Sequence, residues 1–180
     1  PGAVSLDHIR STCTACQLCL QHCPTGVIRP NDSIGKGYGT FFPLIDYQEG
    51  FCQFDCIQCS QVCPANALRP LSLDEKKHTR IGLSHFHWSR CIVYTQETAC
   101  GACAEHCPTG AVNMVPYRNG VRIPQLDSEF CIGCGACQCA CPVDPKAMIV
   151  KGQIKQNRIS LKTDMIRDTI QKKRDIDFPF

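Results

Sequence analysis

The sequence predicts an α+β fold made of two tandem copies of a small cysteine-rich module, followed by a C-terminal helical tail. The 180 residues include 17 cysteines, and sixteen of these fall into four motifs of similar spacing. A short phrase of small and β-branched residues follows the motifs, which is the mark of an internal repeat. The hydrophobic fraction is 43%, and cysteine supplies much of it. Aliphatic packing alone is therefore too thin to hold this fold.

Each motif has three cysteines, then three intervening residues, and then Cys-Pro. The motifs are Cys13-x2-Cys16-x2-Cys19-x3-Cys23, Cys52-x3-Cys56-x2-Cys59-x3-Cys63, Cys91-x8-Cys100-x2-Cys103-x3-Cys107 and Cys131-x2-Cys134-x2-Cys137-x3-Cys141. Cysteines two residues apart place three thiolates around one face of an iron–sulfur cubane, and the fourth points at a different cluster. This spacing is typical of bacterial ferredoxins. It predicts sixteen ligands for four [4Fe–4S] clusters and leaves over Cys139, expected to be a small buried residue.

Three other uses of cysteine fit the pattern less well. A disulfide framework is disfavoured by the odd count and by the repeated triplets. Structural zinc sites use pairs of Cys-x2-Cys rather than triplets that end in Cys-Pro. The run from Cys52 to Cys59 looks like a radical S-adenosylmethionine triad, but that chemistry leaves one iron without a cysteine, whereas Cys63 follows here. The cysteines are therefore predicted to be cluster ligands.

The chain divides into two ferredoxin-like modules and a tail. The predicted ranges are 1–72 for the first two-cluster module, 73–152 for the second and 153–180 for a basic, helical tail. Residues 73–80 are expected to be a polar connector. In the second module, apolar segments at 111–115 and 121–126 flank an Asn-Gly turn and predict a hairpin. Strands at 81–88 and 147–150 are expected to enter and leave this module.

The composition changes near residue 154. Residues 151–180 hold eight Lys or Arg against four Asp. Ser160 is predicted to cap a helix that runs to about Lys173, with an apolar stripe on one side. Two interpretations remain open: a helix that lies on the protein's own surface, or a docking element for a partner or an anionic membrane.

Two pairings of the motifs are possible, because each cluster takes three ligands from one motif and one from another. Neighbour pairing gives Cys13, Cys16, Cys19 with Cys63; Cys52, Cys56, Cys59 with Cys23; Cys91, Cys100, Cys103 with Cys141; and Cys131, Cys134, Cys137 with Cys107. A nested pairing, first motif with fourth and second with third, is similar to the iron–sulfur subunits of molybdenum oxidoreductases. The complete hairpin between motifs three and four favours neighbours.

The aromatic residues Trp88, Tyr94, Phe130 and Phe51 are adjacent or close to ligands and are expected to shield the clusters from water. Gly133 and Gly135 lie between ligands, where a missing Cβ permits a tight loop and lets backbone N–H groups approach sulfide.

The chain resembles the NapG/MauM-type ferredoxin family, or polyferredoxins. The resemblance rests on Pro1-Gly2-Ala3, on the four motifs in order, and on the eight-residue gap between Cys91 and Cys100. Motif two departs from the family pattern, because Cys52-x3-Cys56-x2-Cys59 replaces the family's usual wider third gap. The resemblance implies four [4Fe–4S] clusters, an electron carrier tied to periplasmic respiratory enzymes, and an upstream export signal or membrane anchor.

These observations predict an electron carrier rather than an enzyme. Saturated cubanes leave no open iron for a substrate, and no Walker loop, dinucleotide fingerprint or Ser/His/Asp arrangement is present. The balanced charge of +3 is unlike that of nucleic-acid binders. We expect no nucleic acid and no small-molecule substrate.

The expected role is to pass single electrons from a membrane- or quinol-linked donor to a redox enzyme in a respiratory chain. The expected partners are redox proteins, including a membrane-bound quinol- or ferredoxin-type component. The expected location is at the membrane, on the periplasmic side, with an upstream signal or anchor absent from this chain. Two alternatives remain: a tightly bound iron–sulfur subunit of a molybdenum or tungsten oxidoreductase complex, and a soluble ferredoxin that works alone.

Overall fold

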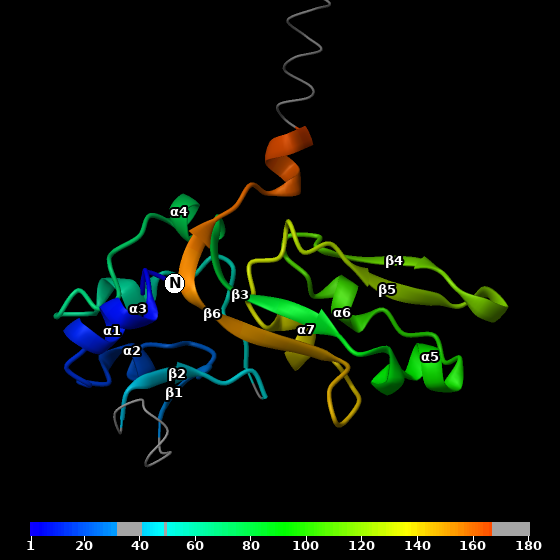
Figure 1. Cartoon of the computed structure of the whole chain (residues 1–180), viewed down its shortest axis with the longest axis horizontal. Coiled ribbons are helices and arrows are strands. Elements are labelled where there is room, and N and C mark those ends of the chain that lie inside the picture. Colours follow the sequence, from blue (N-terminus) through cyan, green and yellow to red (C-terminus); the bar gives the residue numbers. More distant parts are fainter. Residues whose placement is uncertain (32–40, 49, 167–180) are drawn as a thin grey trace, which may run out of the picture.

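The computed structural model describes residues 1–31, 41–48 and 50–166. In this part of the chain, short helices accompany three two-stranded antiparallel sheets, β1–β2, β3–β6 and β4–β5. Figure 1 shows the two halves of the chain side by side, with β3 and β6 in the middle of the molecule. The mixture of short helices and small sheets confirms the predicted α+β class.

The N-terminal half holds its helices against one small hairpin. Ser5 caps the first helix by accepting a hydrogen bond from the His8 N–H at 3.1 Å, as expected for a serine at this position. The elements are α1 (Leu6–Thr12), α2 (Leu18–Gln21), β1 (Ile28–Pro30), β2 (Pro43–Ile45) and α3 (Gln58–Gln61).

The second half repeats this arrangement and adds to it. Helices α6 and α7 correspond to α2 and α3, and the β4–β5 hairpin corresponds to β1–β2. The added elements are a 3-10 turn, η1, and α5, which occupies the long gap of motif three and buries Val93 completely. The bounds are η1 (Trp88–Arg90), α5 (Ile92–Gln96), α6 (Ala102–Glu105), β4 (Val112–Pro116), β5 (Arg122–Leu126) and α7 (Ala136–Cys139).

One turn confirms a sequence prediction, and one pair of histidines shows that the two halves are equivalent. The predicted hairpin forms, and its turn, η2 (Arg118–Gly120), has φ of 51° at Asn119 and 78° at Gly120, as an Asn-Gly turn requires. His22 and His106 end equivalent helices. Each ring donates from Nδ1 to the carbonyl four residues earlier, at 2.9 Å.

The longest strand corrects the predicted start of the tail. Strand β6 (Met148–Arg158) pairs with β3 (Thr79–Phe86) and runs eight residues beyond the exit strand expected at 147–150. Residues 153–158 are therefore strand and not helix. They carry no alternation of apolar and polar residues, so their strand character comes from backbone pairing. Part of this pairing is with the N-terminal segment, where the Gln156 N–H donates to the Val4 carbonyl at 2.8 Å.

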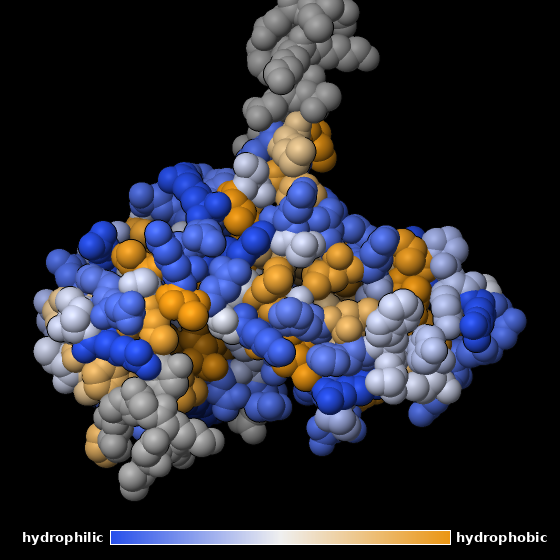
Figure 2. Space-filling model, viewed as in Figure 1, coloured by the Kyte–Doolittle hydropathy of each residue, from blue (hydrophilic) through white to orange (hydrophobic). Residues whose placement is uncertain are grey.

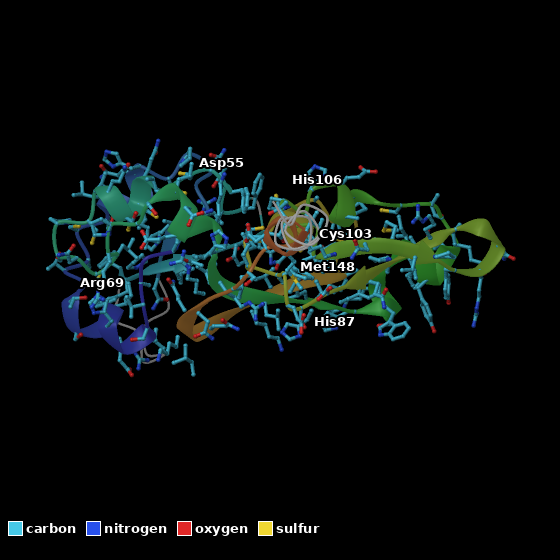
Figure 3. The ribbon with its side chains drawn as sticks, turned by 90° about the horizontal axis from the view of Figure 1, so that it is seen from above. Asp55, Arg69, His87, Cys103, His106 and Met148 are labelled. Atoms are coloured by element: carbon cyan, nitrogen blue, oxygen red, sulfur yellow. The ribbon has the colours of Figure 1, made fainter. Side chains whose placement is uncertain are left out.

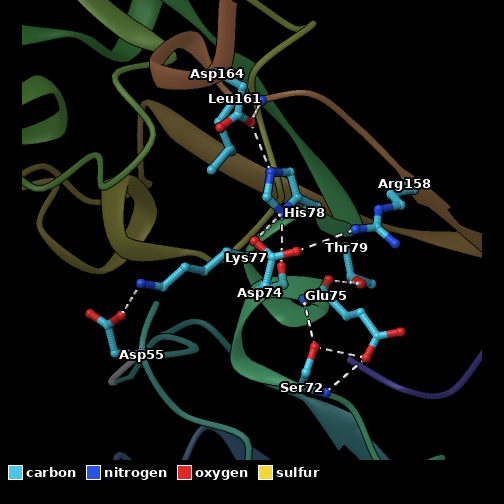
Figure 4. Close-up of polar contacts among 10 residues, drawn as sticks. All are labelled: Asp55, Ser72, Asp74, Glu75, Lys77, His78, Thr79, Arg158, Leu161 and Asp164. Carbon is cyan, nitrogen blue, oxygen red and sulfur yellow. Dashed lines mark hydrogen bonds and ion pairs between the residues drawn. The ribbon is translucent and has the colours of Figure 1, made fainter. Parts of the chain in front are cut away.

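The predicted polar connector contains a helix, α4 (Leu73–Lys77), that starts with a capping box (Figure 4). The Ser72 Oγ accepts from the Glu75 N–H at 3.2 Å, and the Glu75 carboxylate accepts from the Ser72 N–H at 2.9 Å. These bonds to Ser72 lower the pKa of Glu75. The pairing of a serine with a glutamate three residues later is a known start signal for helices.

The described part of the tail packs on the protein itself. Residues 162–166 are helical, which agrees with the start of the predicted helix, while 167–173 lie outside the described residues. Leu161 is buried against Ile132 and Ala136, and Lys162 donates from Nζ to the Gly110 carbonyl at 2.7 Å. Among the described residues, no helix has the length and apolarity needed to cross a bilayer.

His78 holds this C-terminal segment to α4. Its Nδ1 donates to the Asp74 carbonyl and its Nε2 lies on an Asp164 carboxylate oxygen, both at 2.8 Å, while Arg158 pairs with the Asp74 carboxylate at 3.3 Å. The hydrogen bond to the Asp74 carbonyl raises the pKa of His78 most, and the hydrogen bond to Asp164 raises it further. Because the folded pKa lies above the unfolded value of about 6.5, the stabilisation is complete below that pH and is lost as the pH rises through the folded pKa.

We therefore expect His78→Gln to lower the free energy of unfolding by up to about 1 kcal/mol near pH 6, as for partly exposed ion pairs, and by less near pH 8. The measurement is anaerobic thermal unfolding of the variant and the parent protein at matched pH. His106→Gln is the control, since that exposed ring bonds only to its own helix. A difference that stays constant between the two pH values contradicts the prediction.

Candidate functional site

The structure brings the sixteen motif cysteines together in four cavities. Each cavity is lined by three cysteines of one motif and the last cysteine of the neighbouring motif. We name them cavity A (Cys13, Cys16, Cys19, Cys63), cavity B (Cys52, Cys56, Cys59, Cys23), cavity C (Cys131, Cys134, Cys137, Cys107) and cavity D (Cys91, Cys100, Cys103, Cys141). The grouping is that of neighbour pairing and not that of nested pairing.

Cys139 behaves differently from the other sixteen. It lies in α7, is partly exposed and is absent from the lining of the four cavities. The expectation that it is buried is wrong, because its position on α7 turns it away from the side that carries Cys137.

Two buried or half-buried cations hold the cysteine loops. Lys76 is only 2% exposed, and its ammonium donates to the carbonyls of Gln53 and Phe54 in the widened first gap of motif two. The Arg80 guanidinium donates from Nε to the Cys131 carbonyl at 2.7 Å. Both residues lie in the predicted connector, where no spacing marks them, so the sequence analysis missed them. They satisfy backbone carbonyls that the loops otherwise leave without partners.

Several donors point at the cysteine sulfurs. Backbone N–H groups of Ala15, Leu68 and Ala147 donate to Cys13, Cys63 and Cys141 respectively, at 3.3–3.4 Å. The Ser84 hydroxyl lies 3.4 Å from the Cys137 sulfur. Hydrogen bonds to sulfur favour the thiolate over the thiol.

Burial and crowding oppose ionisation in the same cavities. Burial, and then the neighbouring cysteines, raise the pKa of Cys103 to about 12 and that of Cys19 to about 11. Burial also raises the pKa of Cys134 to about 12. A bound cation would offset this effect at Cys19, Cys103 and Cys134, because cysteine binds metal as the thiolate.

The donor set therefore fits an iron–sulfur cluster. Each cavity presents four sulfurs, the ligands that [4Fe–4S] clusters take, and the walls next to them are largely apolar. Such clusters, when bound, accept and release single electrons. The chain's own contribution is to hold the sulfurs, supply hydrogen bonds to them and limit contact with water.

Contacts between the cavities place them in the order A, B, C, D. Helix α2, which carries Cys19, packs against α3, which carries Cys59, and this sets A beside B. Cys103 and Cys137 belong to one buried cluster, which sets C beside D. The Cys52 N–H donates to the Cys134 carbonyl at 2.8 Å, which joins B to C. In Figure 3, Cys103 lies in the second half of the molecule, together with Met148.

Cavity B opens into a wider apolar hollow of about 420 Å³. The hollow lies between the N-terminal segment, the β1–β2 hairpin and β6, and Figure 2 shows apolar surface in this region. Leu44 and Ile154 on its lining are 40% and 73% exposed.

The expected aromatic shielding is only partly correct. Phe51 and Phe130 are half-buried, but Trp88 and Tyr94 are 61% and 44% exposed. Phe86 covers cavity D instead, and Trp88 stacks on its outer side with ring centroids 6.4 Å apart. Proximity in sequence to a ligand did not predict which ring would face the cavity.

Comparison with known proteins agrees with this geometry. A family described as 4Fe-4S dicluster domain matches residues 12–67 and 98–144. The chain is 31% identical over 144 residues to the ferredoxin-type protein NapF of Escherichia coli K12, covering 79% of each chain. It is 31% identical over 157 residues to the methylamine utilization ferredoxin-type protein MauM of Methylobacillus flagellatus, covering 83% of this chain and 66% of MauM. It is 26% identical over 159 residues to the ferredoxin-type protein NapG of E. coli K12, covering 83% and 68%.

Short helices and small hairpins that gather cysteines in fours define an iron–sulfur protein of the ferredoxin type, which transfers electrons and is not an enzyme. The chain belongs to the 4Fe-4S dicluster domain family and is homologous to the NapF, NapG and MauM ferredoxin-type proteins.

Proposed function

We propose that this chain carries four [4Fe–4S] clusters, one in each of cavities A to D, and passes single electrons along that row. The grouping of the sixteen motif cysteines into four sets of four carries the proposal. The adjacency of A to B, B to C and C to D supports transfer along the whole molecule. Cys16 of cavity A is exposed, which supports entry or exit of electrons at that end.

We further propose that the chain works as a NapG/MauM-type carrier. The long gap of motif three, occupied by α5, supports this placement. Its donor would be a membrane-bound quinol- or ferredoxin-type component and its acceptor a redox enzyme, with the chain held at the periplasmic side of the membrane. Protease treatment of spheroplasts from the native host tests the location, since it digests periplasmic proteins and spares cytoplasmic ones.

A tightly bound iron–sulfur subunit of a molybdenum or tungsten oxidoreductase is the less favoured alternative. Nested pairing and a large permanent interface would favour that interpretation, whereas the cysteines that line each cavity come from neighbouring motifs.

Iron and acid-labile sulfide, measured after anaerobic reconstitution of the full chain, test the cluster count. Four cubanes require about sixteen iron atoms per chain. Cys137→Ala removes one sulfur from cavity C and is expected to lose about four of them. Cys139→Ala, a neighbouring cysteine outside the cavities, is the matched control and is expected to lose none. About eight iron atoms in the parent protein, or an equal loss in both variants, would overturn the proposal.

A further inference from the structure

Tyr47 occupies the junction between cavities B and C. Its side chain lines cavity B and is only 7% exposed. Its hydroxyl donates to the Gly133 carbonyl at 2.7 Å, and Gly133 lines cavity C. A buried tyrosine hydroxyl normally finds such a partner, but here the partner belongs to the cysteine loop of the other half of the chain.

The ring of Tyr47 lies directly on this loop. Gly135 has φ of +87°, and a Cβ at that position would come within 1.9 Å of the Tyr47 Cδ1. Glycine is therefore needed both for the backbone conformation and for the close approach of the ring. The aromatic ring and the loop between Cys134 and Cys137 are in van der Waals contact.

A second bond crosses the same junction. The Cys52 N–H donates to the Cys134 carbonyl at 2.8 Å. Within each half, the helices that carry cysteines pack against each other, α2 on α3 and α6 on α7. Phe51, Cys52 and Phe54 also pack against the buried cluster of Ile132, Cys134 and Ala136. Tyr47 adds to this apolar contact a ring that lies on the Gly135 backbone and a hydrogen bond to Gly133.

We infer that Tyr47 is a positioning residue for electron transfer between the two halves of the protein. By holding the motif-four loop against the motif-two loop, it fixes the separation and relative orientation of the clusters in cavities B and C. This inference rests on the proposed function, because it requires clusters in both cavities. Electron transfer falls steeply with separation, so the rate between the halves depends on this contact.

The test compares Tyr47→Phe, which removes only the hydroxyl, with Tyr47→Leu, which also removes the ring. Tyr117→Phe is the matched control, since that half-buried tyrosine packs beside cavity D. Reconstituted full-length proteins are compared by iron content, by the spin–spin interactions in the electron paramagnetic resonance spectrum of the reduced state, and by the rate of electron redistribution after pulsed reduction.

We expect Tyr47→Phe to retain its iron, to change the spin–spin interaction and to slow redistribution several-fold, with a larger effect in Tyr47→Leu and none in Tyr117→Phe. Unchanged spectra and rates in both Tyr47 variants overturn the inference. Loss of iron in Tyr47→Phe also overturns it, because Tyr47 is then needed to form the site. A parent protein with about eight iron atoms instead refutes the proposed function, which keeps the two failures distinct.

Discussion

Removal of iron from the anaerobically purified protein is expected to abolish most of its regular structure. The longest helix with described bounds has seven residues, and α2, α3, α6 and α7 have four each. Isolated helices below about 12–15 residues are marginal in water, and so is a lone hairpin. The buried apolar clusters also contain ligand cysteines, among them Cys91, Cys103 and Cys134. Cluster binding and folding should therefore be one event.

Far-ultraviolet circular dichroism before and after treatment with ferricyanide and a chelator measures this effect. The native spectrum should disappear with the iron and return when iron and sulfide are restored. Chelator without oxidant is the control for direct effects of the reagent. An iron-free sample that kept the native spectrum and a cooperative thermal transition would show that the polypeptide folds without clusters.

Gly133→Ala is expected to prevent assembly of cavity C. Gly133 has φ of +72°, and a Cβ there would lie 2.3–2.4 Å from backbone atoms of Gly82 in β3. Gly82 is itself confined, since a Cβ on it would come within 2.7 Å of the Lys151 carbonyl oxygen. Backbone faces backbone on both sides, so no side chain can move away to relieve the contact.

The expected result is the loss of about four iron atoms and a large fall in the thermal unfolding midpoint. Gly120→Ala separates the two causes, because Gly120 has φ of +78° and nothing within 4 Å of its missing Cβ. That control should show only the cost of a positive φ, about 1 kcal/mol. Equal effects of the two substitutions on iron content would contradict the steric explanation.

The local features of the fold could be predicted from the sequence. The Asn-Gly turn and its flanking apolar segments identify the β4–β5 hairpin because the signal lies within a few residues. The Cys-Pro endings identify the four motifs for the same reason. The hairpin between motifs three and four favours neighbour pairing, which remains a prediction that the lining of the cavities supports.

The features that depend on contacts between the halves could not be predicted. Tyr47 lies in a segment with no motif, and only the folded chain brings it to Gly133. In the sequence, Lys76 is one of several charged residues in a polar segment. In the structure it is buried, because its ammonium donates hydrogen bonds to two loop carbonyls. Gly133 was expected to permit a tight loop whose backbone N–H groups approach sulfide. The structure also requires glycine there because the Gly82 backbone lies where a Cβ would be.

Strand β6 starts in the second half and ends against the first, where Ser5 pairs with Lys155. The two modules resemble duplicated units, but β6, the last strand of the second, pairs with the N-terminal segment of the first. A domain boundary at residue 152 would divide β6 and leave the N-terminal segment without its backbone partners. Recombination or engineering can therefore not move the first module alone, because its N-terminal segment pairs with a strand of the second.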